Sequence, residues 1–336
     1  MSHSPLVTIV MSTYNGERFV RQQLDSLIEQ KYANWCLLIR DDGSSDSTVN
    51  IIDEYQSRDA RIRMVRDTHG NLGPAKSFIC LLQQVTSPIF MCCDQDDIWL
   101  PHKVHQAVDR LEGSGDIPKL FFTDLVVVDD ALNVIAESFM TFQKFNPHRA
   151  SSIKGLLMQN VVVGCTMAGN HALLKLIQPA ALKDCVQMLM HDWWLALLAS
   201  AFGTIEYSPV ALILYRQHGG NSLGAPGSNF ARYIAMLRNT KPWERASLYI
   251  CKVALQCSAF GRTYGYLLNC ADVDAIEKVA ALASSRSCVP LARALIAGLT
   301  MNGWLRNAAL FFSVVVHPTS RNVSFHLRVV AVKEEV

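Results

Sequence analysis

The sequence lacks the features that mark a secreted or membrane-spanning protein. No run reaches the roughly 18 consecutive apolar residues of a spanning helix. Residues 1–5 have neither the basic start nor the apolar core of a signal peptide. The 10 cysteines form no C-x-x-C pair and mostly lie in apolar segments, a pattern typical of free thiols in a reducing compartment. We therefore expect a cytoplasmic protein.

The sequence also has little excess of either charge. With 31 basic and 29 acidic residues its net charge is +2, so electrostatics gives no reason to expect a nucleic acid partner. Half of its 336 residues are hydrophobic and 18% are charged, which is typical of a globular chain with one large or two moderate domains. The chain has no internal repeat or low-complexity tract, which excludes solenoids and largely disordered proteins.

Strand-like and helical segments alternate through the N-terminal third. The expected strands are 6–11, 35–40, 62–65 and 89–93. The expected helices between them are 17–30, 49–56 and 75–84. Such alternation predicts an α/β fold with a doubly wound, mostly parallel sheet and helices on both faces. The polar loops 12–17, 41–46 and 94–97 would then meet at the carboxyl edge of the sheet, where ligands bind in this architecture.

The rest of the chain has a less regular pattern. The expected elements are a strand at 119–125, a hairpin at 126–139, a helix at 151–159, a strand at 161–168, a helix at 191–201 and a strand at 210–215. From residue 229 onward the pattern is mainly helical. Gly, Asn and Pro in the 219–228 loop indicate a boundary. We therefore expect a domain at 1–225, with halves of about 1–118 and 119–225, and a helical C-terminal extension at 226–336.

An acidic cluster at residues 94–97 follows the apolar run 88–92. The carboxylates of Asp94, Asp96 and Asp97 repel one another unless a cation or hydrogen-bond donors neutralise them. Oxygen ligands at this spacing suit Mg²⁺ or Mn²⁺, which also bind phosphate oxygens. Acidic clusters also occur as solvated turns, so the motif by itself leaves both interpretations open.

Four motifs in order make the sequence similar to a known family. They are residues 7–17 (VTIVMSTYNGE), 39–46 (IRDDGSSD), 71–73 (NLG) and 94–101 (DQDDIWLP). Together they resemble an inverting family 2 glycosyltransferase with the GT-A fold, over about residues 5–220. Within that family the resemblance favours the bacterial rhamnosyltransferase-like group, which builds surface polysaccharide such as O-antigen or capsule.

The resemblance implies a site for a nucleoside-diphosphate sugar between the first two strand ends. By motif position, Thr13, Tyr14 and Glu17 would border the nucleoside. Asp42 would accept a hydrogen bond from the ring N–H of a pyrimidine base, a role that suits a carboxylate. The neighbouring Asp41 is better explained as a turn and cap residue.

The resemblance further implies a metal site beside the diphosphate. Asp96 would bind Mg²⁺ or Mn²⁺ directly, and Asp94 would reach the ribose or a metal-bound water. The metal would stabilise the departing diphosphate as a Lewis acid. A motif at residues 215–222 closes over the donor diphosphate in relatives, so Arg216 is a candidate phosphate ligand and His218 a candidate metal ligand.

An inverting transfer also needs a base for the acceptor hydroxyl. The family places a carboxylate at the start of a helix in its second half, and the matching residue is Asp192. A first-turn Asp that only interacts with the helix dipole is the alternative, and this position is expected to lower its pKa. The preceding residue is His191 where the family more commonly has Glu; it would orient the acceptor or have no chemical role.

The sequence has neither the Gln-x-x-Arg-Trp motif nor the membrane spans of processive synthases, which favours the addition of one or a few sugars. Acceptors in the resembling group are saccharides or lipid-linked oligosaccharides, and the apolar tail around Trp304 is a candidate for peripheral contact with the inner membrane face. A nucleotidyltransferase is disfavoured because no Gly-rich basic loop follows the first strand. A non-catalytic nucleotide-sugar-binding subunit of a polysaccharide-assembly complex is the remaining alternative.

Overall fold

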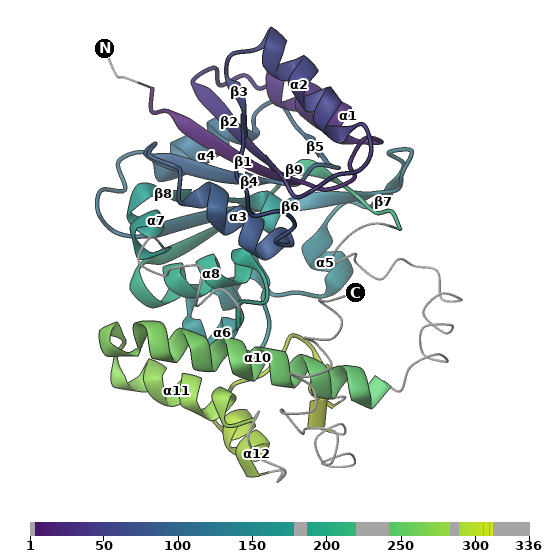
Figure 1. Ribbon diagram of the computed structural model, residues 1–336. Helices are drawn as coiled ribbons and strands as arrows, with labels where there is room; N and C mark the ends of the chain where they lie inside the picture. The colour runs from purple at the N-terminus through teal and green to yellow at the C-terminus, as the bar shows by residue number, and fades with distance from the viewer. Residues whose placement is uncertain are drawn as a thin grey trace.

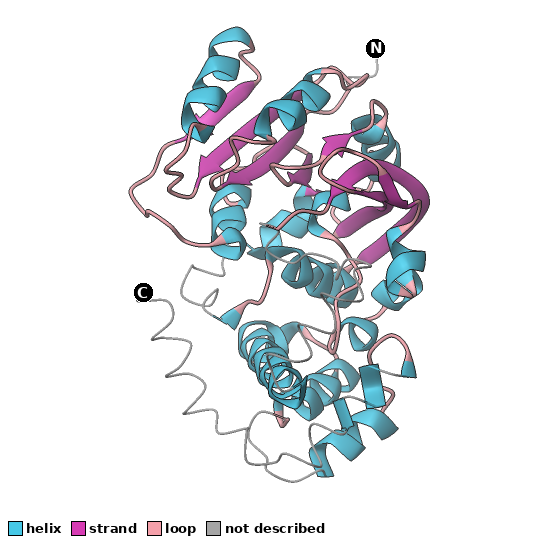
Figure 2. Cartoon of the chain, turned by 90° about the vertical axis from the view of Figure 1, so that its right-hand side faces the viewer, coloured by secondary structure: helices cyan, strands magenta, loops and turns pink. Residues whose placement is uncertain are grey.

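A twisted sheet forms the upper part of the molecule, and helices pack beneath it (Figure 1). The computed structural model describes residues 4–177, 187–219, 242–282, 289–304, 306–308 and 310–311. Among these residues the sheet has nine strands, in the order β3-β2-β1-β4-β8-β6-β9-β5, with β7 paired to β6. Figure 2 shows the strands together at one end and the C-terminal helices at the other. The expected α/β sheet with a helical C-terminal part is confirmed.

The N-terminal half of the sheet is parallel, as predicted. Its strands are β1 (Val7–Thr13), β2 (Trp35–Asp41), β3 (Ile62–Val65) and β4 (Ile89–Cys93). The helices that connect them are α1 (Val20–Ile28), α2 (Thr48–Arg58) and α3 (Pro74–Leu82). β1 is buried on both faces: Ile9 packs in the core on one side of the sheet, and Val10 packs in the core on the other. A strand covered on both faces is a continuous apolar run, which is why the sequence predicted β1 and β4 well.

The second half of the sheet is mixed. Its strands are β5 (Ile98–Trp99), β6 (Lys119–Val128), β7 (Val134–Ala136), β8 (Met167–Asn170) and β9 (Thr204–Arg216). β8 pairs antiparallel to both β4 and β6, whereas β6 and β9 are parallel. The expected hairpin is present as β6 and β7.

The expected strand at 161–168 is wrong for most of its length. Val161 to Val163 form no regular element, Gly164–Thr166 is a 3₁₀ turn, and β8 begins only at Met167. The apolar residues of this segment are buried against other elements without pairing in the sheet. Three of the described helices were not predicted: α4 (Lys103–Leu111), α5 (Phe139–Gln143) and α7 (His171–Ile177).

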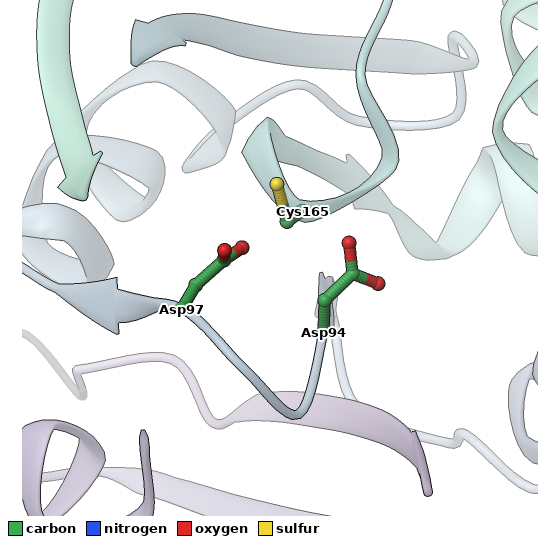
Figure 3. A group of neighbouring side chains, drawn as sticks. All are labelled: Asp94, Asp97 and Cys165. Carbon is green, nitrogen blue, oxygen red and sulfur yellow. The ribbon is translucent and has the colours of Figure 1, made fainter. Parts of the chain in front are cut away.

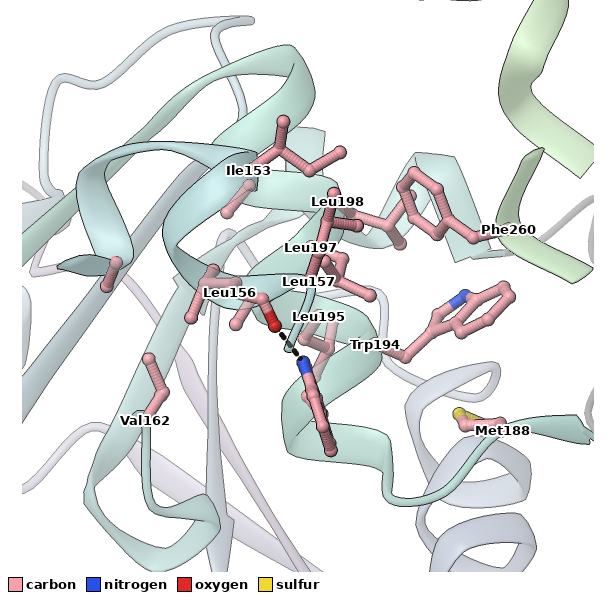
Figure 4. Packing of buried hydrophobic residues seen from close by; sticks show 14 of the residues in the cluster. Ile153, Leu156, Leu157, Val162, Met188, Trp194, Leu195, Leu197, Leu198 and Phe260 are labelled. Atoms are coloured by element: carbon pink, nitrogen blue, oxygen red, sulfur yellow. Dashed lines mark hydrogen bonds between the residues drawn. The ribbon is translucent and has the colours of Figure 1, made fainter. Parts of the chain in front are cut away.

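Helix α8 (His191–Phe202) is the centre of the lower core. Its side chains from Trp193 to Ala199 are all buried, since the helix lies between the sheet and α10 (Pro242–Tyr264). Figure 4 shows its leucines packed with Leu156 of the short helix α6 (Ile153–Leu156) and with Phe260 of α10. The indole N–H of Trp193 donates to the Leu156 carbonyl at 2.8 Å.

The C-terminal helices α10, α11 (Cys270–Ala280) and α12 (Val289–Ile296) share this core with α8. The expected domain boundary near residue 225 falls in 220–241, outside the described residues. None of the described helices combines the length and the apolar character that crossing a membrane requires.

Candidate active site

A cavity of about 610 Å³ opens where β1, β2 and β4 end. One side of the cavity is lined by the loops that follow these strands, with side chains that include Thr13, Tyr14, Asp42, Asn71, Asp94 and Asp96. The three polar loops of the N-terminal half therefore meet at one edge of the sheet, as predicted. The strand register explains this, because Thr13 lies beside Asp41 and Met11 beside Cys93.

The opposite side of the cavity comes from the second half of the chain. It is lined by Phe139 of α5 (Phe139–Gln143), by Phe145, by Val161 to Val163, and by His191 and Asp192 of α8. Apart from His191, Asp192, Asn160 and Tyr215, the residues that line this side are apolar or glycine. The cavity therefore has a polar wall and a mainly apolar wall.

The loops on the polar wall hold one another. The Tyr14 N–H donates to the Gln95 side-chain oxygen at 2.9 Å, and the Gln95 amide donates back to the Tyr14 carbonyl at 3.0 Å. The Asn15 N–H donates to the Ser44 hydroxyl at 2.8 Å. A Cβ on Gly16 would lie 2.3 Å from the Gln95 side chain, so only glycine allows this close approach.

Asp42 is buried, and three donors hold its carboxylate. The Arg40 guanidinium donates to it at 2.5 Å, and the N–H groups of Leu72 and Gly73 each donate at 2.8 Å. Arg40 also donates to Asp67 at 2.7 Å and is itself buried. One guanidinium therefore neutralises two carboxylates and ties the loop after β3 to the end of β2.

Of the three residues expected to border a nucleoside, two line the cavity. Tyr14 is exposed at its mouth, and Thr13 is buried with its hydroxyl donating to Asp41 at 2.8 Å. Glu17 is not among the lining residues; its carboxylate accepts from the Ser47 N–H at 2.9 Å, just before α2. Glu17 therefore lies in the loop after β1, and its carboxylate holds the residue that precedes α2.

The acidic cluster is divided between the cavity and the core. Asp94 and Asp96 line the cavity, whereas Asp97 is fully buried and accepts from the Arg216 N–H at 3.1 Å. Burial raises the pKa of Asp94 to about 7, with further contributions from the charges of Asp96 and Asp192. Burial also raises the pKa of Asp97 well above its usual value.

Two groups of side chains are candidates for a metal ion. Ligand atoms of Asp94, Asp97 and Cys165 lie within 4.8 Å of one another (Figure 3). Burial raises the pKa of Asp97 and of the Cys165 thiol well above their usual values, which disfavours the charged forms, and a thiol is in any case a poor ligand for a hard cation. In the second group, the Asp96 carboxylate lies 2.7 Å from Nε2 of His218. These two residues fit Mg²⁺ or Mn²⁺ better, and Asp96 lines the cavity.

Arg216 does not line the cavity, so its expected contact with phosphate has no support in this geometry. Its guanidinium donates to the carbonyls of Asp96 at 2.9 Å and Asp130 at 2.6 Å, and to the Gln22 side chain at 2.7 Å. It also lies 4.6 Å from the centre of the Phe19 ring. Arg216 therefore fastens the acidic loop to the end of β9, beside a separate hollow of about 260 Å³.

Asp192 lies in the first turn of α8 and faces the cavity. Burial raises its pKa to about 7, against the lowering effect of hydrogen bonds from the backbone of Trp193 and Gly164. The expected lowering by the helix N-terminus is therefore wrong, because desolvation outweighs it. A carboxylate with this pKa is suited to accept a proton near neutral pH.

His191 is buried against the Phe78 ring, 3.9 Å away and nearly parallel. Burial lowers its pKa to about 3, so the ring is neutral at physiological pH. Neither ring nitrogen has a hydrogen-bond partner among the described residues, although the side chain lines the cavity.

Sequence reasoning missed Arg40, Gln95 and the apolar wall. A basic residue next to Asp41 in an otherwise apolar strand was a signal for a buried ion pair. The apolar wall carried no such signal, because Val161 to Val163 have the composition of a strand.

Comparisons with known proteins show the family of this chain. The model of Glycosyl transferase family 2 matches residues 8–154. The dTDP-rhamnosyl transferase RfbG of Shigella flexneri is 30% identical over 70% of this chain and 81% of its own length. The chain therefore belongs to glycosyltransferase family 2 and is a transferase that uses nucleotide sugars.

Two further similarities are of lower identity. The UDP-Glc:alpha-D-GlcNAc-diphosphoundecaprenol beta-1,3-glucosyltransferase WfgD of Escherichia coli is 27% identical over 48% of this chain and 58% of its own length. Among solved structures, the mannosyltransferase PcManGT from Pyrobaculum calidifontis, in complex with GDP-Man and Mn²⁺, has a TM-score of 0.52 at 15% identity, over 94% of this chain and 88% of that chain. This likeness shows a shared GT-A-like fold.

Proposed function

We propose that this protein is an inverting, metal-dependent hexosyltransferase of bacterial surface polysaccharide biosynthesis, such as that of O-antigen or capsule. Its donor would be a nucleoside-diphosphate sugar, with dTDP-L-rhamnose favoured, and its acceptor a saccharide or lipid-linked saccharide. The observation that carries the proposal is one cavity lined by Asp94 and Asp96 after β4 and by Asp192 from α8. It places carboxylates suited to a metal–diphosphate and a carboxylate suited to a base around one space.

On the donor side, we assign the base of the nucleotide to the space beside Tyr14 and Asp42. The Asp42 carboxylate is already oriented by Arg40 and two backbone N–H groups. Its oxygens have further lone pairs, which can accept a hydrogen bond from a pyrimidine ring N–H. Asp94 is placed to accept from a ribose hydroxyl.

The metal would be held by Asp96 and His218. The chemistry that bound Mg²⁺ or Mn²⁺ supplies is neutralisation of the negative charge on the leaving diphosphate. The position of Arg216 supports this assignment indirectly, since it fixes the backbone of Asp96 through a hydrogen bond to the Asp96 carbonyl.

Asp192 would act as the general base. It accepts the proton of the acceptor hydroxyl while that oxygen attacks the anomeric carbon and the bond to the diphosphate oxygen breaks. Attack on the face opposite the leaving group inverts the anomeric centre. The neutral His191 next to it can hold an acceptor hydroxyl, because one ring nitrogen donates and the other accepts.

The relatives support the finer parts of the proposal. RfbG is a dTDP-rhamnosyl transferase, and the name of WfgD gives a diphosphoundecaprenol-linked acceptor. We propose the same classes of donor and acceptor for this protein. We also propose that it acts in the cytoplasm, with peripheral contact at the inner membrane face. We further propose that residues 1–118 bind the donor, 119–225 bind the acceptor, and 226–336 support the acceptor half.

Calorimetric titration with dTDP, UDP and GDP, with and without Mn²⁺, tests this proposal. We expect one nucleotide to bind in a metal-dependent manner to the wild type and to Asp109→Ala, a matched control on the exposed face of α4. Asp96→Ala should lose this binding. A folded wild-type protein that binds none of the three nucleotides would refute the proposal, and binding without transfer would indicate a non-catalytic subunit.

A further inference from the structure

The outward side of α12 is apolar, where an outward side is usually polar. The exposed residues of this helix are Val289, Ala292, Arg293 and Ile296, which repeat with helical spacing and form one stripe. Ile296 is 87% exposed. By contrast, the neighbouring helix α11 exposes Asp274 and Glu277 to solvent, as amphipathic surface helices normally do.

The residues after α12 continue this character. Trp304 is 76% exposed and Phe311 is 49% exposed. We call Val289, Ala292, Ile296, Trp304 and Phe311 the apolar surface. Single exposed apolar side chains are common on proteins, but large ones that recur within one short segment mark an interaction site.

The charge of this part of the chain indicates what the site binds. Between Lys278 and Lys333 the sequence has no Asp or Glu, whereas it has five Arg. The exposed Arg293 lies in the stripe itself. Basic residues beside exposed Trp and Ile are typical of segments that lie in the headgroup region of anionic membranes. A second copy of this chain would bring the same positive charge, which disfavours self-association through this surface.

The apolar surface is joined to the apolar wall of the cavity. The N–H of the buried Asn302 donates to the Gln159 side chain at 2.7 Å, directly before the wall residues that begin at Asn160. The Arg306 guanidinium donates to the Gln143 carbonyl at 3.0 Å and lies 5.0 Å from the centre of the Phe145 ring, which lines the cavity. The segment that carries Trp304 is therefore fastened directly to the residues beside the apolar wall of the cavity.

We propose that the apolar surface docks on a bilayer that contains anionic phospholipids. The docked bilayer holds the acceptor side of the cavity near the membrane, where a lipid-linked acceptor resides. This last step rests on the proposed function, whereas docking itself does not.

Sedimentation of the full chain with lipid vesicles tests the proposal. The vesicles are phosphatidylcholine alone, or phosphatidylcholine with a quarter phosphatidylglycerol. We expect the wild type to bind the anionic vesicles at least about tenfold more strongly, and the binding to weaken as salt is raised. The double variant Ile296→Ser/Trp304→Ser should bind them about tenfold less than the wild type.

Two further variants make the result specific. Ile117→Ser/Val134→Ser removes two exposed apolar side chains from the sheet half, and it should bind like the wild type. Arg293→Glu leaves the apolar residues in place, and it should weaken binding to anionic vesicles only. Thermal unfolding followed by circular dichroism verifies that each variant is folded.

Several results would overturn the proposal. These are a wild type that does not bind anionic vesicles, equal binding to neutral and anionic vesicles, unchanged binding by the Ile296/Trp304 variant, and a dimer of the wild type that this variant loses. Nucleotide calorimetry without vesicles gives a separate readout, so failure of docking is distinguishable from failure of the proposed transferase function.

Discussion

We call the polar wall of the cavity the donor wall and the mainly apolar wall the acceptor wall, after the ligands that we propose for them. The two walls differ in how their buried charged groups are stabilised. On the donor wall, the buried Asp42 is paired with the buried Arg40, which also binds Asp67. On the acceptor wall, burial raises the pKa of Asp192 to about 7 and lowers that of His191 to about 3. Neither of these two has an ion-pair partner among the described residues.

This difference explains how one cavity can both bind a ligand and take part in proton transfer. Ion pairs and backbone donors on the donor wall hold the loops in place before any ligand arrives, which lowers the entropy cost of binding. On the acceptor wall, desolvation without an opposing charge brings the pKa of Asp192 to about 7 and keeps His191 neutral. Substitutions on the donor wall should therefore affect stability and binding, and substitutions on the acceptor wall should affect chemistry.

The largest expected effect is that of Asp192→Asn. Transfer should fall by about 10²–10⁴-fold because the amide cannot accept the proton, while nucleotide binding stays unchanged. Initial rates with the donor that binds, together with calorimetry, measure both. Asp109→Asn is the control with normal activity. A variant that retains wild-type rates would show that Asp192 is only a helix residue.

The raised pKa of Asp192 also predicts how the wild type responds to pH. Because the group must be ionised to act as a base, kcat/KM should fall about tenfold per unit as pH drops below about 7. The folded state has the higher pKa, so its stability contribution is present at low pH and is lost as pH rises through about 7. At pH 8, Asp192→Asn should therefore raise the free energy of unfolding by about 1–3 kcal/mol. Rate profiles and unfolding curves at pH 5 and pH 8 check both signs, and a gain in stability larger at pH 5 would contradict them.

On the donor wall, Arg40→Leu should lower the free energy of unfolding by about 3–5 kcal/mol, because it leaves Asp42 and Asp67 without their buried partner. Nucleotide affinity should fall as well, since the loop after β3 loses its anchor. Denaturant unfolding measures the effect. Arg66→Leu, which breaks the exposed pair with Asp53, is the control and should change stability by less than about 1 kcal/mol. Similar values for the two variants would contradict the comparison of the walls.

A smaller effect is expected for His191→Phe, which keeps the stacking on Phe78 but removes both ring nitrogens. The KM for the acceptor should rise about tenfold, because one or two hydrogen bonds to the acceptor are lost. The free energy of unfolding should change little. Because the ring is already neutral near pH 7, the pH profile should keep its shape. Steady-state kinetics with varied acceptor test this, and an unchanged KM would leave His191 with a packing role only.

The smallest effect is expected for Glu17→Gln. Its carboxylate binds the Ser47 N–H and not the cavity, so nucleotide affinity should change by less than about twofold. Loss of the charge at this loop should cost about 0.5 kcal/mol of stability. Calorimetry measures nucleotide binding by Glu17→Gln and, for comparison, by Asp42→Asn. The Asp42 variant should bind the nucleotide much more weakly than the Glu17 variant.

Much of the fold was predictable where local pattern and tertiary environment agree. The bounds of β3 and β4 match the expected segments. For β4 the reason is that a strand buried on both faces is an apolar run, which here ends in a polar loop. The segment 161–168 shows the limit of this reasoning. Its first residues are as apolar as a strand, yet they form a cavity wall, and only β8 enters the sheet.

The site was likewise predictable only in part from the sequence. Thr13, Tyr14, Asp42, Asp94, Asp96 and Asp192 were expected around one space, and all line the cavity. Glu17, Arg216 and His218 were expected there and are not among its lining residues. Backbone position follows from motif order, but the direction of a long side chain depends on the acceptors around it. Arg216 has those acceptors in the carbonyls of Asp96 and Asp130.

The sequence by itself determined the parallel half of the sheet and the edge at which its three polar loops meet. Periodicity and loop composition are local properties, and parallel strands bring their carboxyl ends together. Only the tertiary structure decided the pKa of Asp192, the neutral state of His191 and the exposure of the apolar surface. These depend on which groups exclude water from which side chains, and residues distant in the sequence supply those groups.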